Sequence, residues 1–336
     1  MVKNNWTIRL VSVITLFTCF SCHPAGNRLN VDTSNVDIQA VKIYRYEQKL
    51  FDIPSDNLIS ELQKIQADYS VFLNGDLSDS LNLLPLINYI EDTVLQNVNR
   101  DCQRVFTDLD KLETEFTDAL RHHKYYYPEA ELPAIYTYIS GFDYEHPTQI
   151  MENNLLIALD MYLGADYFRY KQLGLPAYML HRFDEQFIVR DCMKELAKTT
   201  INYRNIGAAL LDLMVNEGKI IWYTNAMMPT VNDSILLNYS AYQMEWAKNS
   251  EGAIWAFLLE NEMLYTKDNE PIKKFIYESP FTSYFGAESP PRLGWFIGWK
   301  IVSVYMQNNQ DVDLQALMND YDAQKILQHS GYKPGL

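Results

Sequence analysis

An acidic residue interrupts a strongly apolar stretch in the second half of the chain. Residues 214–229 read MVNEGKIIWYTNAMMP, in which Glu217 lies with Gly218 and Lys219 among apolar and aromatic residues. Burial of a carboxylate is unfavourable unless the group is paired or bound to something. Three roles therefore fit Glu217: a metal ligand, one end of an ion pair, or a polar side chain turned to solvent.

A second charged cluster precedes Glu217 by about twenty residues, in the segment QFIVRDCMKELAK at 186–198. The Asn-Glu-Gly triplet around Glu217 resembles the segment that supplies the third zinc ligand of gluzincin peptidases, and in those enzymes a two-histidine helix lies about that far upstream. The resemblance places RDCMK where HExxH would stand. Arg190 and Lys194 then occupy the histidine positions, and Asp191 occupies the position of the catalytic glutamate.

These substitutions argue against a metal site. Zinc needs neutral or anionic donors, and two fixed positive charges at ligand positions would repel it. Arg190 and Lys194 lie one helical turn apart, at about 6 Å, so we expect an ion-pair network with Glu217 instead. The chain also lacks HExxH, GxSxG, P-loop and GxGxxG sequences. The residues thus predict a zincin-like scaffold without its metal, with no cofactor and no catalytic residue.

Arg292 is a further charged candidate, in the block ESPPRLGWFIGWKIV. Ser289 and the two prolines that follow it are typical of the start of a helix, and Ser289 is the expected cap. A positive charge at a helix start is unfavourable against the helix dipole. We therefore expect Arg292 to pair with a carboxylate, either Glu288 or Glu217, rather than to bind a substrate.

Helices must position most of these residues, and the sequence predicts an α+β domain that is predominantly helical with a small sheet. Alternating β-branched and aromatic residues predict strands within 37–51 and 133–164. Helical periodicity predicts helices at 58–72, 105–120, 184–200, 204–226, 240–266, 291–309 and 313–329. Gly294 and Gly298, four residues apart, should let a neighbouring backbone approach closely. No repeat or linker divides the chain, so residues 37–336 are expected to form one domain.

The N-terminus has the pattern of an export signal. Two basic residues precede an apolar run at 10–20 that is too short for a comfortable membrane span. The run leads into TCFSC, which resembles the lipobox of bacterial lipoproteins. Cys22 fits that pattern better than Cys19, so we expect a signal peptide at 1–21, lipidation of Cys22 and a polar tether at 22–36. An ordinary secretion signal is the alternative.

The net charge of the chain limits the classes of partner that it can bind, and its cysteines and N-terminal residues bear on its location. A formal net charge of −15 argues against nucleic acid and against direct docking of the folded body on anionic lipid headgroups. Cys102 and Cys192 would face an oxidising compartment, where they either pair or stay as buried thiols. Residues 23–30 carry no acidic cluster of the kind that resembles a surface-export signal in Bacteroidetes. We therefore expect an anchored protein that faces the periplasm.

Four blocks of the sequence are together similar to the gliding-motility lipoprotein family GldB of Bacteroidetes. The blocks are PAIYTYISGFDY (133–144), NNLLIALDMYLG (153–164), the segment around Glu217, and 288–334. The resemblance implies a cell-envelope lipoprotein whose partners are proteins of gliding motility and type IX secretion. No enzymatic activity follows from the resemblance. The ESPPR segment also recurs in zinc peptidases. Two alternatives remain: a hydrolase that uses Asp191 and Glu217 in an atypical site, and a lipoprotein that binds peptides or glycans.

Overall fold

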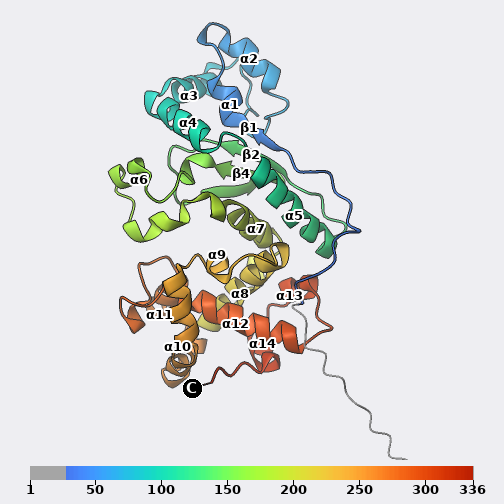
Figure 1. The fold of residues 1–336 in the computed structure, drawn as a ribbon, viewed down its shortest axis with the longest axis vertical. Coiled ribbons are helices and arrows are strands. Elements are labelled where there is room, and N and C mark those ends of the chain that lie inside the picture. The colour runs from blue at the N-terminus through green and yellow to red at the C-terminus, as the bar shows by residue number, and fades with distance from the viewer. Residues whose placement is uncertain (1–27, 336) are drawn as a thin grey trace, which may run out of the picture.

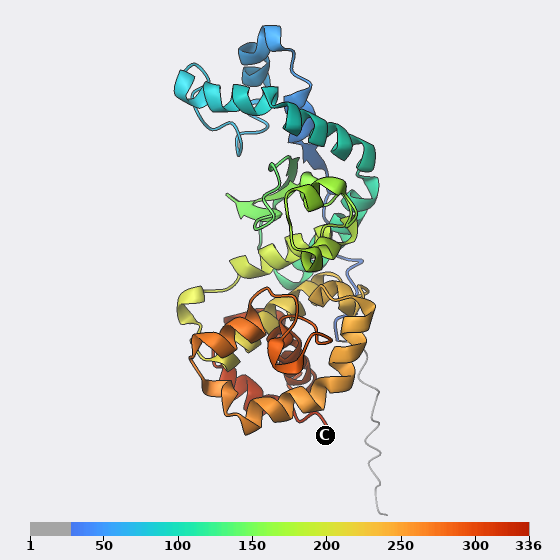
Figure 2. The ribbon, with the colours of Figure 1, turned by 90° about the vertical axis from the view of Figure 1, so that its left-hand side faces the viewer.

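The computed structural model describes residues 28–335, and its architecture confirms an α+β fold that is predominantly helical with a small sheet (Figure 1). The predicted signal peptide at 1–21, Cys19 and Cys22 lie outside the described residues. The chain forms an elongated body. Helices α1–α4 lie at one end, the sheet lies next to them, and α8–α14 form the other end (Figure 2).

The sheet has four strands in the order β1-β2-β4-β3. Their bounds are β1 Ile43–Arg45, β2 Ala134–Tyr138, β3 Thr148–Met151 and β4 Asn154–Ala158. β1, β2 and β4 run parallel, whereas β3 pairs with β4 in the antiparallel direction. The sequence pattern predicts β2 and β4 but misses β3, which is short and lies in a turn-rich segment. Most of the predicted strand at 37–51 is not extended, because the chain turns into a helix at Tyr46.

Five helices pack around and above the sheet. Their bounds are α1 Tyr46–Phe51, α2 Leu58–Ile65, α3 Ser80–Glu91, α4 Thr93–Val105 and α5 Asp110–Tyr126. The predicted helix at 58–72 ends early, at Ile65, yet the ring of Phe72 still stacks on Tyr46 with a centroid separation of 4.2 Å. The expected helix at 105–120 is interrupted after α4 and begins at Asp110.

The other end of the molecule is helical. The remaining helices are α6 Phe168–Gln172, α7 Ile188–Thr199, α8 Leu210–Met227, α9 Asp233–Leu237, α10 Ala241–Glu260, α11 Asn269–Ile276, α12 Leu293–Asn308, α13 Leu314–Asn319 and α14 Ala323–Ser330. α7, α10 and α12 lie within the predicted segments, and α8 extends one residue beyond the segment expected at 204–226. The single helix expected at 313–329 is instead two helices, α13 and α14, with a break at residues 320–322.

Glycines hold α8 and α12 together. A Cβ added to Gly298 would lie 1.7 Å from the carbonyl oxygen of Met214, and one added to Gly218 would lie 2.3 Å from the Gly298 backbone. A Cβ on Gly294 would lie 2.7 Å from the carbonyl oxygen of Phe275. The expectation of close backbone approach at Gly294 and Gly298 is confirmed. It also gives the glycine next to Glu217 a packing role.

The described part of the predicted tether is held on the body. Leu29 is 3 % exposed and belongs to the main hydrophobic core. The Arg28 guanidinium donates hydrogen bonds to the carbonyl oxygens of Met306, Asn309 (3.1 Å) and Val312, beyond which α13 begins. The folded body therefore includes Arg28 and starts earlier than the predicted boundary at residue 37.

Two further findings concern the cysteines and the membrane. Cys102 and Cys192 are free and buried, so the alternative in which they pair is wrong. Burial raises the pKa of both thiols, which leaves them protonated and unreactive. Within residues 28–335, no helix has both the length and the apolar character needed to cross a bilayer.

Candidate functional site

A cleft of about 390 Å³ contains most of the sequence-predicted site residues. Its walls come from the loop before β3, β3 itself and one face of α7. Single residues complete them: Arg182 between α6 and α7, Asn238 after α9 and Arg292 before α12. Five cationic side chains line it: Arg182, Arg190, Lys194, Lys198 and Arg292. Three carboxylates line it as well: Glu145, Asp191 and Glu195. The cleft is thus locally cationic in a chain whose formal net charge is −15.

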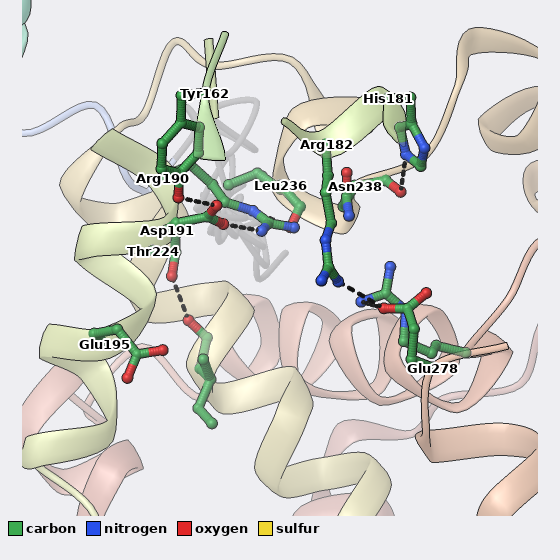
Figure 3. A network of polar contacts seen from close by, with 12 residues as sticks. Tyr162, His181, Arg182, Arg190, Asp191, Glu195, Thr224, Leu236, Asn238 and Glu278 are labelled. Carbon is green, nitrogen blue, oxygen red and sulfur yellow. Dashed lines mark hydrogen bonds and ion pairs between the residues drawn. The ribbon is translucent and has the colours of Figure 1, made fainter. Parts of the chain in front are cut away.

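The guanidinium of Arg190 is hydrogen-bonded to neighbouring groups. Its Nε and Nη2 atoms donate to the carbonyl oxygen of Leu236, at 3.2 and 3.0 Å, and its Nη1 atom pairs with Asp191. Asp191 also accepts a hydrogen bond from the Tyr162 hydroxyl at 2.9 Å. Figure 3 shows this chain of contacts, which connects α7 to α9 and to Tyr162 beyond the end of β4. Arg190 therefore has a structural role here, and its partners among the described residues are Leu236 and Asp191 rather than Glu217.

The charges of Lys194 and Glu217 attract each other. The Lys194 amine lies 3.8 Å from the centroid of the Trp295 ring. Burial lowers the pKa of Lys194 to about 7, while the negative charge of Glu217 on α8 opposes that shift. Among the described residues, the Oε2 atom of Glu217 is buried and receives no hydrogen bond. Lys194 and Glu217 thus attract each other through their charges, but among the described residues they form no ion pair, and Arg190 pairs with Asp191 instead.

Arg292 pairs with a carboxylate, but neither predicted partner is correct. Its Nη1 atom lies 3.3 Å from Oε2 of Glu278, and the Arg182 guanidinium lies 3.2 Å from the same oxygen. Figure 3 shows Arg182 extending toward Glu278. Glu288 instead accepts a hydrogen bond from the Tyr242 hydroxyl at 2.7 Å. Neither Arg182 nor Glu278 was identified from the sequence, because they are far apart along the chain and no local pattern joins them.

The segment before α12 differs from the predicted cap. The Ser289 hydroxyl donates to the carbonyl oxygens of Gly286 and Thr282, so it closes its own loop and does not cap the helix. The Thr282 hydroxyl oxygen accepts from the backbone N–H of Leu293 at 3.3 Å. Arg292 itself has a φ of 53°, in the left-handed region that is unfavourable for a residue with a side chain.

Three guanidinium N–H groups at the cleft have no acceptor among residues 28–335. They are Nε and Nη2 of Arg292 and Nε of Arg182, and all three atoms are buried. Arg292 is 5 % exposed as a residue, and its guanidinium lies 4.4 Å from the Trp295 ring centroid. Buried charged donors are normally satisfied, so an unsatisfied set of this kind is unusual. These free N–H donors could bind an anionic group.

Lys219, next to the Glu217 motif, has a structural role that the sequence did not reveal. It is 1 % exposed, and its amine donates to the carbonyl oxygens of Met318 (3.0 Å) and Asp320 (2.9 Å). Burial lowers its pKa to about 8, and the charge of Asp320 opposes the shift. These bonds account for the break between α13 and α14, because Lys219 satisfies carbonyl groups that a continuous helix would use itself.

Within the described part of the chain, no group of three or more histidine, cysteine, aspartate or glutamate residues is placed to hold a metal ion.

The family model described as gliding motility protein GldB matches residues 26–334. No curated protein and no solved structure matches the chain.

Proposed function

The chain belongs to the GldB family of gliding-motility proteins, and from this premise we propose that it is a lipid-anchored envelope component that binds other envelope proteins. Those partners would be components of gliding motility and of the type IX secretion that gliding depends on. The observation that carries the proposal is the family match over residues 26–334, nearly the entire chain. Cys22 would bear the lipid, and the lack of an acidic cluster after it favours a periplasm-facing anchor.

Several contacts favour binding over catalysis. Arg190 and Lys194 occupy the positions where a gluzincin peptidase would carry histidines, and both are cations that oppose a bound metal ion. The Arg190 guanidinium is occupied by Leu236 and Asp191. We therefore infer that the domain is a pseudo-peptidase, in which a zincin-like arrangement serves as a binding scaffold. The packing of α7 against α8 supports this inference, since these two helices carry Lys194 and Glu217, whose charges attract each other.

Genetic complementation tests the non-enzymatic role. A strain that lacks the protein would be complemented with the wild-type chain or with Glu217→Gln, and gliding and secretion would be scored after the folded level of each protein is matched. Equal rescue is expected, because Glu217 has an electrostatic role in the proposed scaffold. Loss of rescue at an equal folded level would contradict a purely binding role.

A specific observation favours the hydrolase as a second candidate. Lys194 has a pKa lowered to about 7 by burial and lines a cleft, and such a group can act as a general acid or base at neutral pH. Metal analysis of the purified protein discriminates between the candidates. Stoichiometric zinc that is lost in Glu217→Gln would support the hydrolase, whereas a metal-free protein that rescues the strain supports the binding role.

A further inference from the structure

We propose that the cationic cleft is a recognition site for a carboxylate group carried by an extended peptide segment of a partner protein. The inference deepens the proposed function and rests on it, since it assumes that the domain binds proteins. It assigns a ligand chemistry to the cleft and names Arg292 as the residue that contacts the carboxylate.

The first argument is a local excess of positive charge. Arg182 and Arg292 both pair with the single carboxylate of Glu278, so the two guanidinium charges share one ion-pair partner. Glu145, the third carboxylate that lines the cleft, is exposed and forms no ion pair among the described residues. The other ion pairs at the cleft are one-to-one: Arg190 with Asp191, and Lys198 with Glu195. A buried excess charge is costly unless something balances it. One added monoanion would balance the pair of arginines.

The second argument is the geometry of the unsatisfied donors. The Nε and Nη2 atoms of Arg292 are neighbours on one edge of the planar guanidinium, and neither has an acceptor among the described residues. Two parallel N–H groups of this kind form the fork that binds a carboxylate through both of its oxygens. Arg292 is 5 % exposed, so packing holds this fork in position before any ligand arrives.

Lys194 supplies a second positive group at the cleft. The charged groups that act on it are Arg190 and Lys198 on its own helix, Glu217 on α8, and Arg292 before α12. A carboxylate bound nearby would favour the protonated amine and raise the pKa of Lys194 above about 7. Binding should therefore weaken as the pH rises from 6 to 9, because the free cleft loses this charge in that range.

The third argument is the strand that forms one wall of the cleft. β3 is at the edge of the sheet, and Pro147, just before it, accepts a hydrogen bond from the Ala158 N–H at 2.9 Å. In an antiparallel pair the hydrogen-bonded positions alternate. The backbone groups of Thr148 and Ile150 therefore point away from β4. An extended peptide can add to such an edge as another strand. The cleft thus offers free backbone groups of β3 for pairing with a peptide, beside the Arg292 guanidinium that would bind the carboxylate.

The carboxylates already at the cleft favour a monoanion over phosphate. Asp191 and Glu195 both line it, and each would repel the second charge of a phosphate dianion. The arginines at this site already pair with carboxylates, which shows that the local geometry accepts that group. A C-terminal carboxylate or an aspartate or glutamate side chain supplies the same chemistry.

Peptide retention tests the proposal. The full-length protein in detergent would be immobilised and exposed to two random hexapeptide libraries, one with free C-terminal carboxylates and one amidated, and bound peptides would be identified by mass spectrometry. We expect the free acids to be retained roughly 10-fold better. Within the amidated library, we expect enrichment of aspartate and glutamate. Arg292→Gln should abolish both preferences, whereas Arg100→Gln, an exposed arginine on α4 outside the cleft, should leave them unchanged.

Other outcomes would overturn the inference. Equal retention of the two libraries without acidic enrichment, or no retention, would show that the cleft does not select carboxylates. Displacement of bound peptide by inorganic phosphate at a much lower concentration than acetate would assign the fork to phosphate instead. If Arg292→Gln fails to fold, Lys194→Gln provides the second variant, with reduced retention expected at pH 6 and little change at pH 9. Failure of these tests together with full rescue by Glu217→Gln would remove the ligand assignment and leave the proposed function standing.

Discussion

At the scale of single residues, Glu217 is best understood through its effect on Lys194. Attraction between the two charges stabilises the fold only while Lys194 is protonated, which requires a pH below its pKa of about 7. Glu217→Gln should therefore lower the free energy of unfolding at pH 6 by roughly 1 kcal/mol, because the two charges attract without a direct ion pair. The loss should fade above pH 8, where Lys194 is neutral with or without Glu217. Urea denaturation at a series of pH values measures this.

Glu260→Gln is a suitable control for that experiment, since Glu260 is exposed at the end of α10. Its substitution should change the unfolding free energy by no more than about 0.5 kcal/mol at either pH. A penalty for Glu217→Gln that is the same at pH 6 and pH 9 would show that the carboxylate acts through packing rather than through the charge of Lys194.

Lys219 gives a second prediction at this scale. Lys219→Met removes the donor to the buried carbonyl oxygen of Met318 and to the partly buried carbonyl oxygen of Asp320. We expect a loss of roughly 1–3 kcal/mol in the free energy of unfolding at pH 7. Lys325→Met is a matched control, because Lys325 is exposed and reaches only the side chain of Asp320, at 2.8 Å. Its loss should stay below about 1 kcal/mol. Equal losses would contradict a special role for Lys219.

The residue scale also shows the limit of local sequence reasoning. The excess charge on Arg292 correctly indicated a carboxylate partner, because a cation at a helix start needs one. The sequence does not identify that partner as Glu278, because Glu278 is brought to Arg292 by the fold of the segment between α11 and α12. Of the two expected partners, Glu288 accepts a hydrogen bond from Tyr242, and Glu217 forms no ion pair with Arg292 among the described residues. Arg182 and Thr282 were missed for the same reason: their partners are set by tertiary structure.

At the scale of secondary-structure elements, the contact between α8 and α12 depends on glycine. Gly298→Ala would place a methyl group 1.7 Å from the carbonyl oxygen of Met214, which is backbone and cannot rotate away. The helices would have to separate, and we expect a loss above about 4 kcal/mol or failure to fold. Thermal unfolding followed by circular dichroism measures this. Gly335→Ala is the control, because a Cβ there meets nothing within 4 Å. A folded Gly298→Ala protein with an unchanged midpoint would contradict the close crossing.

The elements that the sequence predicts are those whose pattern is set by local burial. Alternation in AIYTY indicates β2, and the apolar periodicity of α7, α8 and α12 indicates their helices. β3 escapes this reasoning because it has four residues and depends on pairing with β4. The split between α13 and α14 escapes it because Lys219 comes from a distant helix. The order of the strands and the position of the cleft likewise depend on contacts far apart in sequence.

At the scale of the whole molecule, the proposed lipid on Cys22 would determine how the folded body is attached to the membrane. Cys22→Ala should move the protein from the membrane fraction to the soluble fraction, because the acyl chains supply the membrane affinity at about 0.8 kcal/mol per buried CH₂. Immunoblots of fractionated cells measure this. Cys19→Ala should leave the protein in the membrane. The opposite result for the two variants would assign the lipid to Cys19.

The orientation of the body follows from the docking of Arg28. Only a few residues separate Cys22 from Arg28, and they reach at most about 20 Å. Arg28 is bound to carbonyl groups at the end of α12, so that end should face the bilayer. α2 lies at the far end of the molecule (Figure 1). A fluorophore on Gln310→Cys should therefore transfer energy to a membrane dye more efficiently than one on Ser60→Cys.

Both of those positions are exposed, whereas the native thiols of Cys102 and Cys192 are buried, so labelling should be selective. Adding Cys22→Ala to either variant should remove the energy transfer, because the protein then leaves the membrane. Equal transfer from Gln310→Cys and Ser60→Cys in the anchored protein would mean that the long axis lies along the bilayer. An upright body, by contrast, would hold the cationic cleft away from the bilayer surface, because the cleft is lined by β3 and α7, which lie between the membrane-proximal helices and the far end of the molecule (Figure 1).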